Sequence, residues 1–389
     1  MNNTFINRDL EHEILRLTEH FPVIVLSGPR QSGKTTLCKN LFKTYYRVDL
    51  DDANVIMNIQ SSPKDFLMQH TDGLIIDEAQ RFPELFSCIK VVVDEKPEAR
   101  YILTGSSNFL LMKSVTESLA GRVALLTLLP LSLKELNRGS DFKTDDLLFN
   151  GGFPAVWGKN IPSIDVVKNY YNTYVERDIR QIINIKDINK FQIFIRLCAG
   201  RTGTEFNASN LSNEVGISLV TIQEWLSILE ASYVLFRLQP FYQNIGKRLI
   251  KTSKIYFYDT AMVCFLLGIE NCKQLKTHPQ YGQIFENFVV LEFLKNRIHA
   301  GKSNNLFFYR DKSQHEIDII QEFGYKYRAY EIKSATAFHS DFTKNLDYLR
   351  KLLGDCLLST KVIFDGDIEL DSTENGIINF RSIKNETGL

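Results

Sequence analysis

Cysteine is scarce in this sequence, and the few cysteines present show no pairing pattern. The six residues, at positions 38, 88, 198, 264, 272 and 356, lie far apart, and no Cys-x-x-Cys pair occurs. This spacing excludes a common zinc motif and a disulfide framework, and it favours the reducing cytoplasm as the location. Charge of one sign is not in excess either, because 46 basic residues balance 46 acidic ones. Any contact with nucleic acid therefore requires a local basic patch.

Long apolar runs are also missing. No stretch reaches the roughly 18 uninterrupted apolar residues that a membrane-spanning helix needs, and the first 20 residues lack the apolar core of a signal peptide. We therefore expect no membrane partner. The sequence has no internal repeat and no low-complexity tract. Its 389 residues, 44% of them hydrophobic, are enough for two or three domains.

The clearest motif is the stretch SGPRQSGKTTL at 27–37, which follows the apolar run PVIVLSG. It matches G-x-x-x-x-G-K-[ST] between a predicted strand and a predicted helix, as a phosphate-binding loop requires. Backbone N–H groups of 30–35 and the helix N-terminus would hold the β-phosphate. Lys34 would bridge the β- and γ-phosphates, and the Thr35 hydroxyl would bind Mg²⁺. The predicted nucleotide-binding residues are Gly28, Pro29, Arg30, Gln31, Ser32, Gly33, Lys34, Thr35 and Thr36, together with Asp77 and Ser106.

A second apolar run, GLIIDEAQ at 73–80, ends in two acidic residues. About 40 residues after a phosphate loop, such a strand is typical of an NTP-hydrolysing site. Asp77 would hold the Mg²⁺ through water, and Glu78 would polarise the attacking water.

Two further segments carry candidate residues for the same site. ARYILTGSSNFLL at 99–111 predicts a third strand, at whose carboxyl end Ser106 or Asn108 would sense the γ-phosphate, although a plain turn explains these residues equally well. Arg122 would act as an arginine finger in its own subunit or a neighbouring one, and a surface ion pair is the alternative. The predicted catalytic residues are thus Lys34, Glu78 and Arg122.

Strands alternating with helical stretches over about 20–135 predict a parallel sheet with helices on both faces. The segments GPRQSGKTT, LIIDEAQR, YILTGSS and SLAGRVALLTLLPLS together resemble a large prokaryotic family of AAA-type P-loop ATPases with a C-terminal domain of unknown function. The resemblance continues in NGGFPAVW, YVERDIRQI and KRLIKTSKIYFYDTAMV. This chain has Thr-Ser-Lys at 252–254 and Asp-Thr-Ala-Met at 259–262, where the family usually has Ser-Pro-Lys and Asp-Thr-Gly-Leu. The resemblance implies binding of ATP or ADP with Mg²⁺ and self-assembly into a homo-oligomer.

The middle of the chain predicts a helical connector and then a winged helix. The connector, 165–187, carries a polar cluster of Glu176, Arg177, Asp178 and Arg180, which would contact nucleotide, a neighbouring subunit or only solvent. Residues 207–241 then give a helix, a turn at 216–218 and a second helix capped by Ser218. YVLFRLQPF and KIYFYD predict the two strands of a wing.

Whether this unit binds DNA is left open by its charges. The second helix offers Thr221, Gln223 and Glu224 but no arginine or lysine, which suits phosphate contacts poorly. The wing side carries the basic residues Arg237, Lys247, Arg248, Lys251 and Lys254. DNA contact and a structural or subunit-contact role are both consistent with this pattern.

The C-terminal part predicts a helix at 281–298 that carries Glu286, followed by three strands within 305–336. Asp318 lies inside one strand and Glu331 and Lys333 end the next, so strand pairing would bring two carboxylates and a lysine together. Two carboxylates suit a hard cation, and the lysine would stabilise developing negative charge. This D…ExK pattern resembles the PD-(D/E)XK nucleases, in which Glu286 would complete the metal site. A non-cutting fold whose polar cluster binds DNA or stabilises the sheet is the alternative.

The sequence therefore predicts an α/β protein: a P-loop AAA-type sheet, a winged-helix module and a restriction-endonuclease-like domain. The predicted boundaries are 1–150 for the ATPase domain, 151–200 for the connector, 201–260 for the winged-helix-like module and 261–389 for the nuclease-like domain. We expect ATP hydrolysis coupled to the binding or remodelling of branched or duplex DNA, with a candidate metal-dependent nuclease site. An ATP-dependent switch or scaffold without DNA activity, and a defence nuclease licensed by ATP, are the alternatives.

Overall fold

The computed structural model describes residues 5–106, 118–136, 142–179, 187–241, 252–372 and 375–386. The chain forms two compact units. The first consists of Met1–Leu131 with the short segments Ala231–Tyr233 and Ile298–Lys302, and the second contains the remaining residues. Within the described residues, no helix is both long and apolar enough to span a bilayer.

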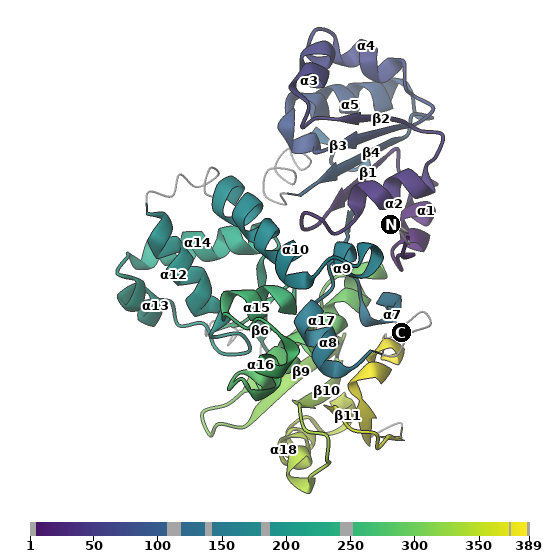
Figure 1. Cartoon of the computed structure of the whole chain (residues 1–389). Coiled ribbons are helices and arrows are strands. Elements are labelled where there is room, and N and C mark those ends of the chain that lie inside the picture. The colour runs from purple at the N-terminus through teal and green to yellow at the C-terminus, as the bar shows by residue number, and fades with distance from the viewer. Residues whose placement is uncertain are drawn as a thin grey trace. The chain divides into compact units, whose positions relative to one another are not determined.

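The first unit contains a five-stranded sheet in the order β2-β3-β4-β1-β5, in which every pairing is parallel. Figure 1 draws this unit in purple and blue, with helices on both faces of the sheet. Its elements are α1 (Glu11–Thr18), β1 (Val23–Ser27), α2 (Lys34–Leu41), β2 (Tyr46–Asp49), α3 (Ala53–Gln60), α4 (Pro63–Met68), β3 (Leu74–Asp77), η1 (Ala79–Arg81), α5 (Glu84–Glu95), β4 (Tyr101–Gly105) and β5 (Val123–Thr127). The parallel sheet expected for this region is confirmed.

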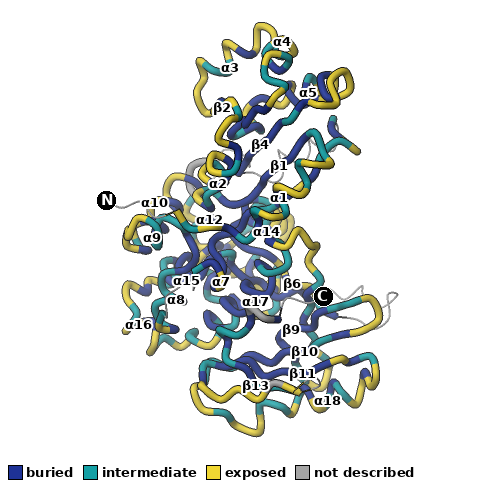
Figure 2. Tube along the Cα trace, turned by 90° about the vertical axis from the view of Figure 1, so that its right-hand side faces the viewer, coloured by how far each residue is buried: buried dark blue, intermediate teal, exposed yellow. Residues whose placement is uncertain are grey.

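β1, which lies between β4 and β5 in this sheet, is buried on both faces because its neighbours and the flanking helices cover it. Val23 and Val25 of β1 pack into one hydrophobic core, whereas Ile24 and Leu26 pack into another. The alternation follows from the two-residue period of a strand. Figure 2 shows β1 and β4 in the dark blue of buried residues. This burial explains why the sequence of β1 is a continuous apolar run.

The second unit begins with helices and then builds its own sheet. Its helical elements before the sheet are α7 (Leu133–Leu136), α8 (Thr144–Asn150), α9 (Pro154–Lys159), α10 (Ser163–Tyr170), the π-helix η2 (Tyr171–Ile179), α12 (Ile188–Ala199), α13 (Ala208–Val215) and α14 (Leu219–Ala231). The predicted helix, turn and second helix are present as α13 and α14, whereas the winged-helix module stays a prediction. Gly216 adopts a left-handed conformation with φ 68° between them, and the Ser218 hydroxyl accepts a hydrogen bond from the Thr221 N–H.

The sheet of the second unit has eight strands in the order β12-β13-β11-β10-β9-β8-β6-β7 and mixes parallel with antiparallel pairs. The elements are β6 (Leu235–Pro240), β7 (Lys254–Phe257), α15 (Thr260–Leu266), α16 (Cys272–Thr277), α17 (Tyr281–His299), β8 (Leu306–Arg310), β9 (Glu316–Phe323), β10 (Lys326–Lys333), η4 (Ser340–Thr343), α18 (Lys344–Leu353), η5 (Gly354–Cys356), β11 (Leu357–Phe364), β12 (Leu370–Asp371), β13 (Asn375–Asn379) and η6 (Phe380–Asn385).

Three strands predicted from the sequence form the middle of this sheet. β9 pairs antiparallel with β8 and with β10, and β10 pairs parallel with β11. Helix α18 supplies Leu346, Leu349 and Leu353 to the core beneath β9, β10 and β11. The predicted pairing of the strand of Asp318 with the strand of Glu331 is thereby confirmed.

The two strands expected to form a wing, β6 and β7, have a neighbour that was not predicted. β6 and β7 do pair antiparallel, with Leu238 opposite Lys254. However, β6 also pairs parallel with β8, so the two strands form the edge of the eight-stranded sheet and not a separate wing. Alternation of apolar residues indicates that a strand exists, but it does not identify the strand's neighbours. The division of the chain into four domains stays a prediction.

Several residues named from the sequence lie outside the described residues. They are Asn108, Arg180, Lys247, Arg248 and Lys251, together with the side chains of Glu176, Arg177 and Asp178.

Candidate functional sites

Three positions with positive φ shape the loop between β1 and α2. Gly28 has φ 141°, Gln31 has φ 61° and Gly33 has φ 96°. A Cβ on Gly28 would overlap the carbonyl oxygen of Leu128, so the backbones of 28 and 128 approach closely only because this residue is glycine. The predicted loop therefore has the tight turn that its glycines require, with Pro29 buried and Gln31 and Thr36 exposed.

Lys34, the first residue of α2, is buried within the loop. Its Nζ donates hydrogen bonds to the carbonyl oxygens of Gly28, at 2.9 Å, and Pro29, at 2.8 Å. Burial lowers the pKa of Lys34 to about 8, and the carboxylates of Glu78 and Asp77 only partly oppose this effect. An anion bound in the loop would stabilise the charged ammonium, so the structure presents a cation whose burial is unfavourable without such a partner.

Asp77 is buried at the carboxyl end of β3 and accepts hydrogen bonds from neighbouring elements. The hydroxyls of Thr35, at 3.0 Å, and Thr104, at 2.6 Å, donate to its Oδ1. Arg47 on β2 donates to Oδ2 from Nε at 2.8 Å, and its Nη2 lies 2.6 Å from the same oxygen. Thr35 and Asp77, both predicted to hold Mg²⁺, are thus in direct contact, and Arg47 is an additional partner of Asp77 that the sequence prediction missed.

Glu78 adopts a left-handed conformation with φ 53°, which is costly for a residue other than glycine. Its Oε2 accepts hydrogen bonds from Gln80 Nε2 at 2.5 Å and from Ser106 Oγ at 3.2 Å. Arg30 Nε in turn donates to Ser106 Oγ at 3.4 Å. Ser106, predicted as a sensor, therefore connects the loop to the acidic residue that was predicted to act on water.

Arg122 lies at the amino ends of the strands, whereas the loop lies at their carboxyl ends. It precedes Val123, which pairs with the first residue of β1, whereas the loop follows the last residue of β1. Five strand residues span about 16 Å. Arg122 forms a bidentate ion pair with Asp94, with contacts of 2.5 and 2.9 Å. This geometry excludes the predicted finger action on the loop of the same chain and agrees with the surface-pair alternative.

Arg8 supports the loop from outside the predicted motif. It is buried, and its Nη1 donates to the Ser32 carbonyl at 2.7 Å while Nη2 donates to the Leu129 carbonyl at 2.6 Å. The guanidinium therefore ties the loop to the segment that follows β5. No sequence motif pointed to Arg8. Its two partners lie 24 and 121 positions away in the chain, so the contacts depend on the fold.

The loop passes a physical test for a polyphosphate with Mg²⁺. Ser32 Oγ is buried and has no hydrogen-bond partner among the described residues, so it can donate to a phosphate oxygen. The glycine cradle leaves no room for a side chain at 28, and Lys34 supplies the buried cation. Thr35 beside Asp77 supplies the oxygen atoms that Mg²⁺ prefers.

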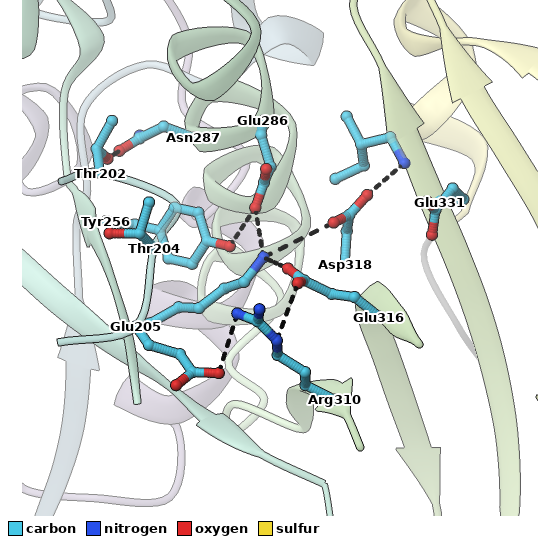
Figure 3. Close-up of polar contacts among 12 residues, drawn as sticks. Thr202, Thr204, Glu205, Tyr256, Glu286, Asn287, Arg310, Glu316, Asp318 and Glu331 are labelled. Carbon is cyan, nitrogen blue, oxygen red and sulfur yellow. Dashed lines mark hydrogen bonds and ion pairs between the residues drawn. The ribbon is translucent and has the colours of Figure 1, made fainter. Parts of the chain in front are cut away.

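A second cluster lies in the second unit around Lys254, the first residue of β7. Lys254 Nζ lies 2.9 Å from Glu286 Oε1, 2.6 Å from Glu316 Oε1 and 3.7 Å from Asp318 Oδ1. Figure 3 shows these contacts converging on one nitrogen between α17 and β9. Tyr256 also donates to Glu286 Oε1 at 2.6 Å. Lys254, named from the sequence as one of the basic residues on the wing side, is buried among carboxylates.

The remaining members of the predicted metal set lie beside this cluster. Lys333 Nζ lies 2.6 Å from Glu331 Oε1, and the Ile332 N–H donates to Asp318 Oδ2 at 2.7 Å. Burial raises the pKa of Glu331 to about 8, with a further contribution from Asp318. Burial likewise raises the pKa of Glu286. The structure thus brings Glu286, Asp318, Glu331 and Lys333 into one region, as the sequence predicted.

Similar proteins occur in a mycobacterium and in an archaeon. The uncharacterized protein Rv2008c of Mycobacterium tuberculosis is 32% identical over 331 residues, which cover 84% of this chain and 73% of that protein. This chain belongs to the same family. The uncharacterized protein MJ1544 of Methanocaldococcus jannaschii is 24% identical and covers 81% of this chain and 74% of its own length.

Three family descriptions divide the chain. An AAA domain matches residues 20–137, and two domains of unknown function, DUF8612 and DUF4143, match 141–273 and 281–382. The Walker-type ATPase paby2304 of Pyrococcus abyssi has a similar fold, with a TM-score of 0.50 and 18% identity over 67% of this chain and 96% of that one. Residues 20–137 are therefore an AAA-type ATPase domain.

The Lys254 cluster joins the two regions of unknown function, because Lys254 lies in DUF8612 whereas its carboxylate partners lie in DUF4143. The sequence did contain a signal for Glu316. It lies two residues before Asp318 on the same strand, and residues two apart on a strand share a face. For Lys254 the only signal was a lysine at the start of the apolar run KIYFY. Among the described residues, no group of three or more His, Cys, Asp or Glu side chains is arranged to hold a metal ion.

Proposed function

We propose that the AAA domain binds ATP with Mg²⁺ at the loop 28–35 and hydrolyses it. The observation that carries this proposal is the meeting of the loop, Asp77 and Glu78 at the carboxyl edge of one parallel sheet. In such sheets this edge is where ligands bind. Bound Mg²⁺ and ATP supply the reactive phosphoanhydride and the cation that neutralises it.

Each residue of the site has a role that its contacts support. Lys34 would turn its ammonium from the loop carbonyls to the β- and γ-phosphates, and Ser32 would donate its hydroxyl to a phosphate oxygen. Thr35 and Asp77 would hold the metal. Glu78, fixed by Gln80 and Ser106, would orient water and accept its proton.

The test is a comparison of ATP binding and turnover in three proteins. Glu78→Gln should bind ATP normally and lower turnover at least about 100-fold, because general-base catalysis contributes roughly that factor. Lys34→Ala should lose binding itself. Glu84→Gln, a matched change in the first turn of α5, should leave turnover unchanged. Equal turnover of Glu78→Gln and wild type would refute the assigned base.

The finer proposal is that nucleotide state controls binding of DNA by the second unit. Its support is the resemblance of the D…ExK pattern to the PD-(D/E)XK nucleases, together with the pairing of the strands that carry Asp318 and Glu331. ATP turnover should then rise when duplex, forked or four-way DNA is added at low salt. No stimulation and no binding at low salt would contradict DNA coupling while leaving ATP hydrolysis untouched.

A switch that recruits another protein is the second candidate, and the surface of α14 favours it. α13 and α14 contain no lysine or arginine. Leu219 and Val220 at the start of α14 are 41% and 62% exposed. An apolar helix start suits a protein surface better than phosphates. Replacement of Val220 by lysine should abolish such recruitment and leave ATP turnover unchanged.

The nuclease activity predicted from the sequence would require a divalent cation at Glu286, Asp318 and Glu331. Its support is that the fold brings these carboxylates and Lys333 into one region. DNA cleavage with Mn²⁺ that disappears in Asp318→Asn and Lys333→Ala would establish it. Such chemistry needs the divalent cation. Whether the cation can bind depends on Lys254, which already neutralises Glu286 and Asp318.

A further inference from the structure

The ammonium of Lys254 lies between the carboxylates that a metal ion would have to bind. It contacts Glu286 and Glu316 at 2.9 and 2.6 Å, and Asp318 lies 3.7 Å away. These are the acidic residues of α17 and β9 that face the cluster in Figure 3. A divalent cation bound to Glu286 and Asp318 would meet a positive charge already seated between them, and the repulsion would be strong in a buried site.

Lys254 cannot easily leave this position, because its backbone is fixed on both sides. It pairs with Leu238 of β6, and it forms a bridge with Glu205 on the other edge of β7. The side chain is 2% exposed, and its Nζ lies 5.6 Å from the centre of the Phe308 ring. A buried lysine without its carboxylate partners would carry a large desolvation penalty. The cation is therefore built into the strand.

Each of these three carboxylates also has a partner besides Lys254. Glu286 accepts a hydrogen bond from Tyr256, and Glu316 Oε2 lies 3.6 Å from Arg310 Nε. Asp318 Oδ2 accepts the Ile332 N–H. A metal ion would have to displace several charge-assisted contacts before it gained its own. The residues present therefore do not fit a divalent metal ion.

We infer that Lys254 is the resident cation of this cluster and that the wild-type site takes neither Mg²⁺ nor Mn²⁺. The second unit then holds Glu286, Glu316 and Asp318 together without a metal, and metal-dependent cutting at this cluster lacks its cation. The lysine belongs to the Thr-Ser-Lys stretch at 252–254. The inference does not depend on ATP hydrolysis, because all of these residues lie in the second unit.

The test measures Mn²⁺ binding to the full chain without nucleotide, by the loss of the free-ion paramagnetic resonance signal. Wild type should show no binding that depends on Asp318. Lys254→Met, which keeps the length and removes the charge, should gain one site that binds at least about ten times more tightly than wild type. The double variant Lys254→Met, Asp318→Asn should lose it again. Any weak binding at the nucleotide loop is common to all variants and cancels.

Lys295→Met is the matched control. Lys295 is equally buried and pairs with Glu292 at 2.9 Å on α17, away from Glu286, Glu316 and Asp318, so its removal should create no Asp318-dependent site. If Lys254→Met does not fold, Lys254→Gln keeps an N–H donor and serves instead. Asp318-dependent Mn²⁺ binding by wild type would overturn the inference, and so would a folded Lys254 variant that gains no site.

Discussion

At the nucleotide loop, single residues determine the backbone path through steric and electrostatic effects. Gly28 allows the loop to pass against the Leu128 carbonyl, and Lys34 fills the space enclosed by the loop carbonyls. Both residues were predicted from the motif alone, because phosphate binding requires these residue types at this spacing. Gly28 thus leads to a prediction about stability, and Lys34 leads to a prediction about the pH dependence of nucleotide binding.

Substitution of Gly28 by alanine should destabilise the first unit and abolish nucleotide binding. The new Cβ would overlap the Leu128 carbonyl, and φ 141° is strained for alanine. We expect a loss of about 3 kcal/mol or more in the free energy of unfolding. Gly121→Ala is the control, because its φ is also positive but its Cβ meets no atom within 4 Å, so only about 1 kcal/mol should be lost. Equal losses in urea unfolding would contradict the clash.

Nucleotide affinity should decrease as the pH rises above about 8. The pKa of Lys34 in the ligand-free protein is about 8, below its usual value, and a bound polyphosphate stabilises the charged form and raises that pKa. Binding therefore takes up a proton above pH 8, and affinity should fall by up to about tenfold per pH unit. Titration of a fluorescent ADP analogue from pH 7 to 9.5 measures this, and a flat profile would contradict the buried ammonium.

At the scale of elements, β2 and β3 are joined through charged side chains as well as backbone hydrogen bonds. Arg47 of β2 binds Asp77 of β3, and Thr104 of β4 binds the same carboxylate. The sequence predicted β3 and β4 from their apolar runs. It did not predict β2, because YRVD is short and only Val48 is buried. Strand order is decided by tertiary packing, so the partner of Asp77 could not be read from spacing.

Replacement of Arg47 by methionine should lower the free energy of unfolding by about 2–3 kcal/mol, because the buried Asp77 would lose its cation. Arg81→Met is the matched control: the Arg81–Asp51 pair has a similar distance, 2.9 Å, but both side chains are about half exposed. That loss should stay below about 1 kcal/mol. Urea unfolding of both variants tests the difference, and a larger loss in Arg81→Met would argue against this account.

At the scale of the whole molecule, the two compact units have separate hydrophobic cores. In the first unit, two cores pack against the two faces of the parallel sheet. In the second unit, a third core packs beneath β9, β10 and β11. Separate cores are the condition for separate unfolding transitions. Ligands of the two units should therefore act on different transitions.

Calorimetry should accordingly resolve two unfolding transitions. Mg²⁺ with ADP at about 100 times its dissociation constant should stabilise only the transition of the first unit, by about 2.7 kcal/mol. Lys34→Ala should abolish this shift, whereas Lys254→Met should lower only the other transition. A single transition that moves as a whole with nucleotide would show that the units unfold together.

The homo-oligomer that the family resemblance implies stays a prediction, and it is tested by mixing two variants. Because Arg122 lies at the edge of the sheet opposite the loop, it can serve as a finger only for a neighbouring copy. Lys34→Ala and Arg122→Ala should each have little ATP turnover alone, and their mixture should regain part of it, since the first supplies Arg122 to the intact loop of the second. Mass measurement with and without ATP should show the oligomer. If Arg122→Ala keeps full turnover, Arg122 is only the surface partner of Asp94.

The sequence by itself determined the nucleotide loop, the acidic end of β3, the helix-turn-helix of α13 and α14 and the strands of Asp318 and Glu331. These features depend on short-range spacing, because turns, caps and alternating burial are set by neighbouring residues. The tertiary structure alone decided the partners: Arg8 for the loop, Arg47 for Asp77, β8 for β6, and Lys254 for three carboxylates. Contacts between residues far apart in the chain depend on how the elements pack, and one sequence does not encode that packing in any local pattern.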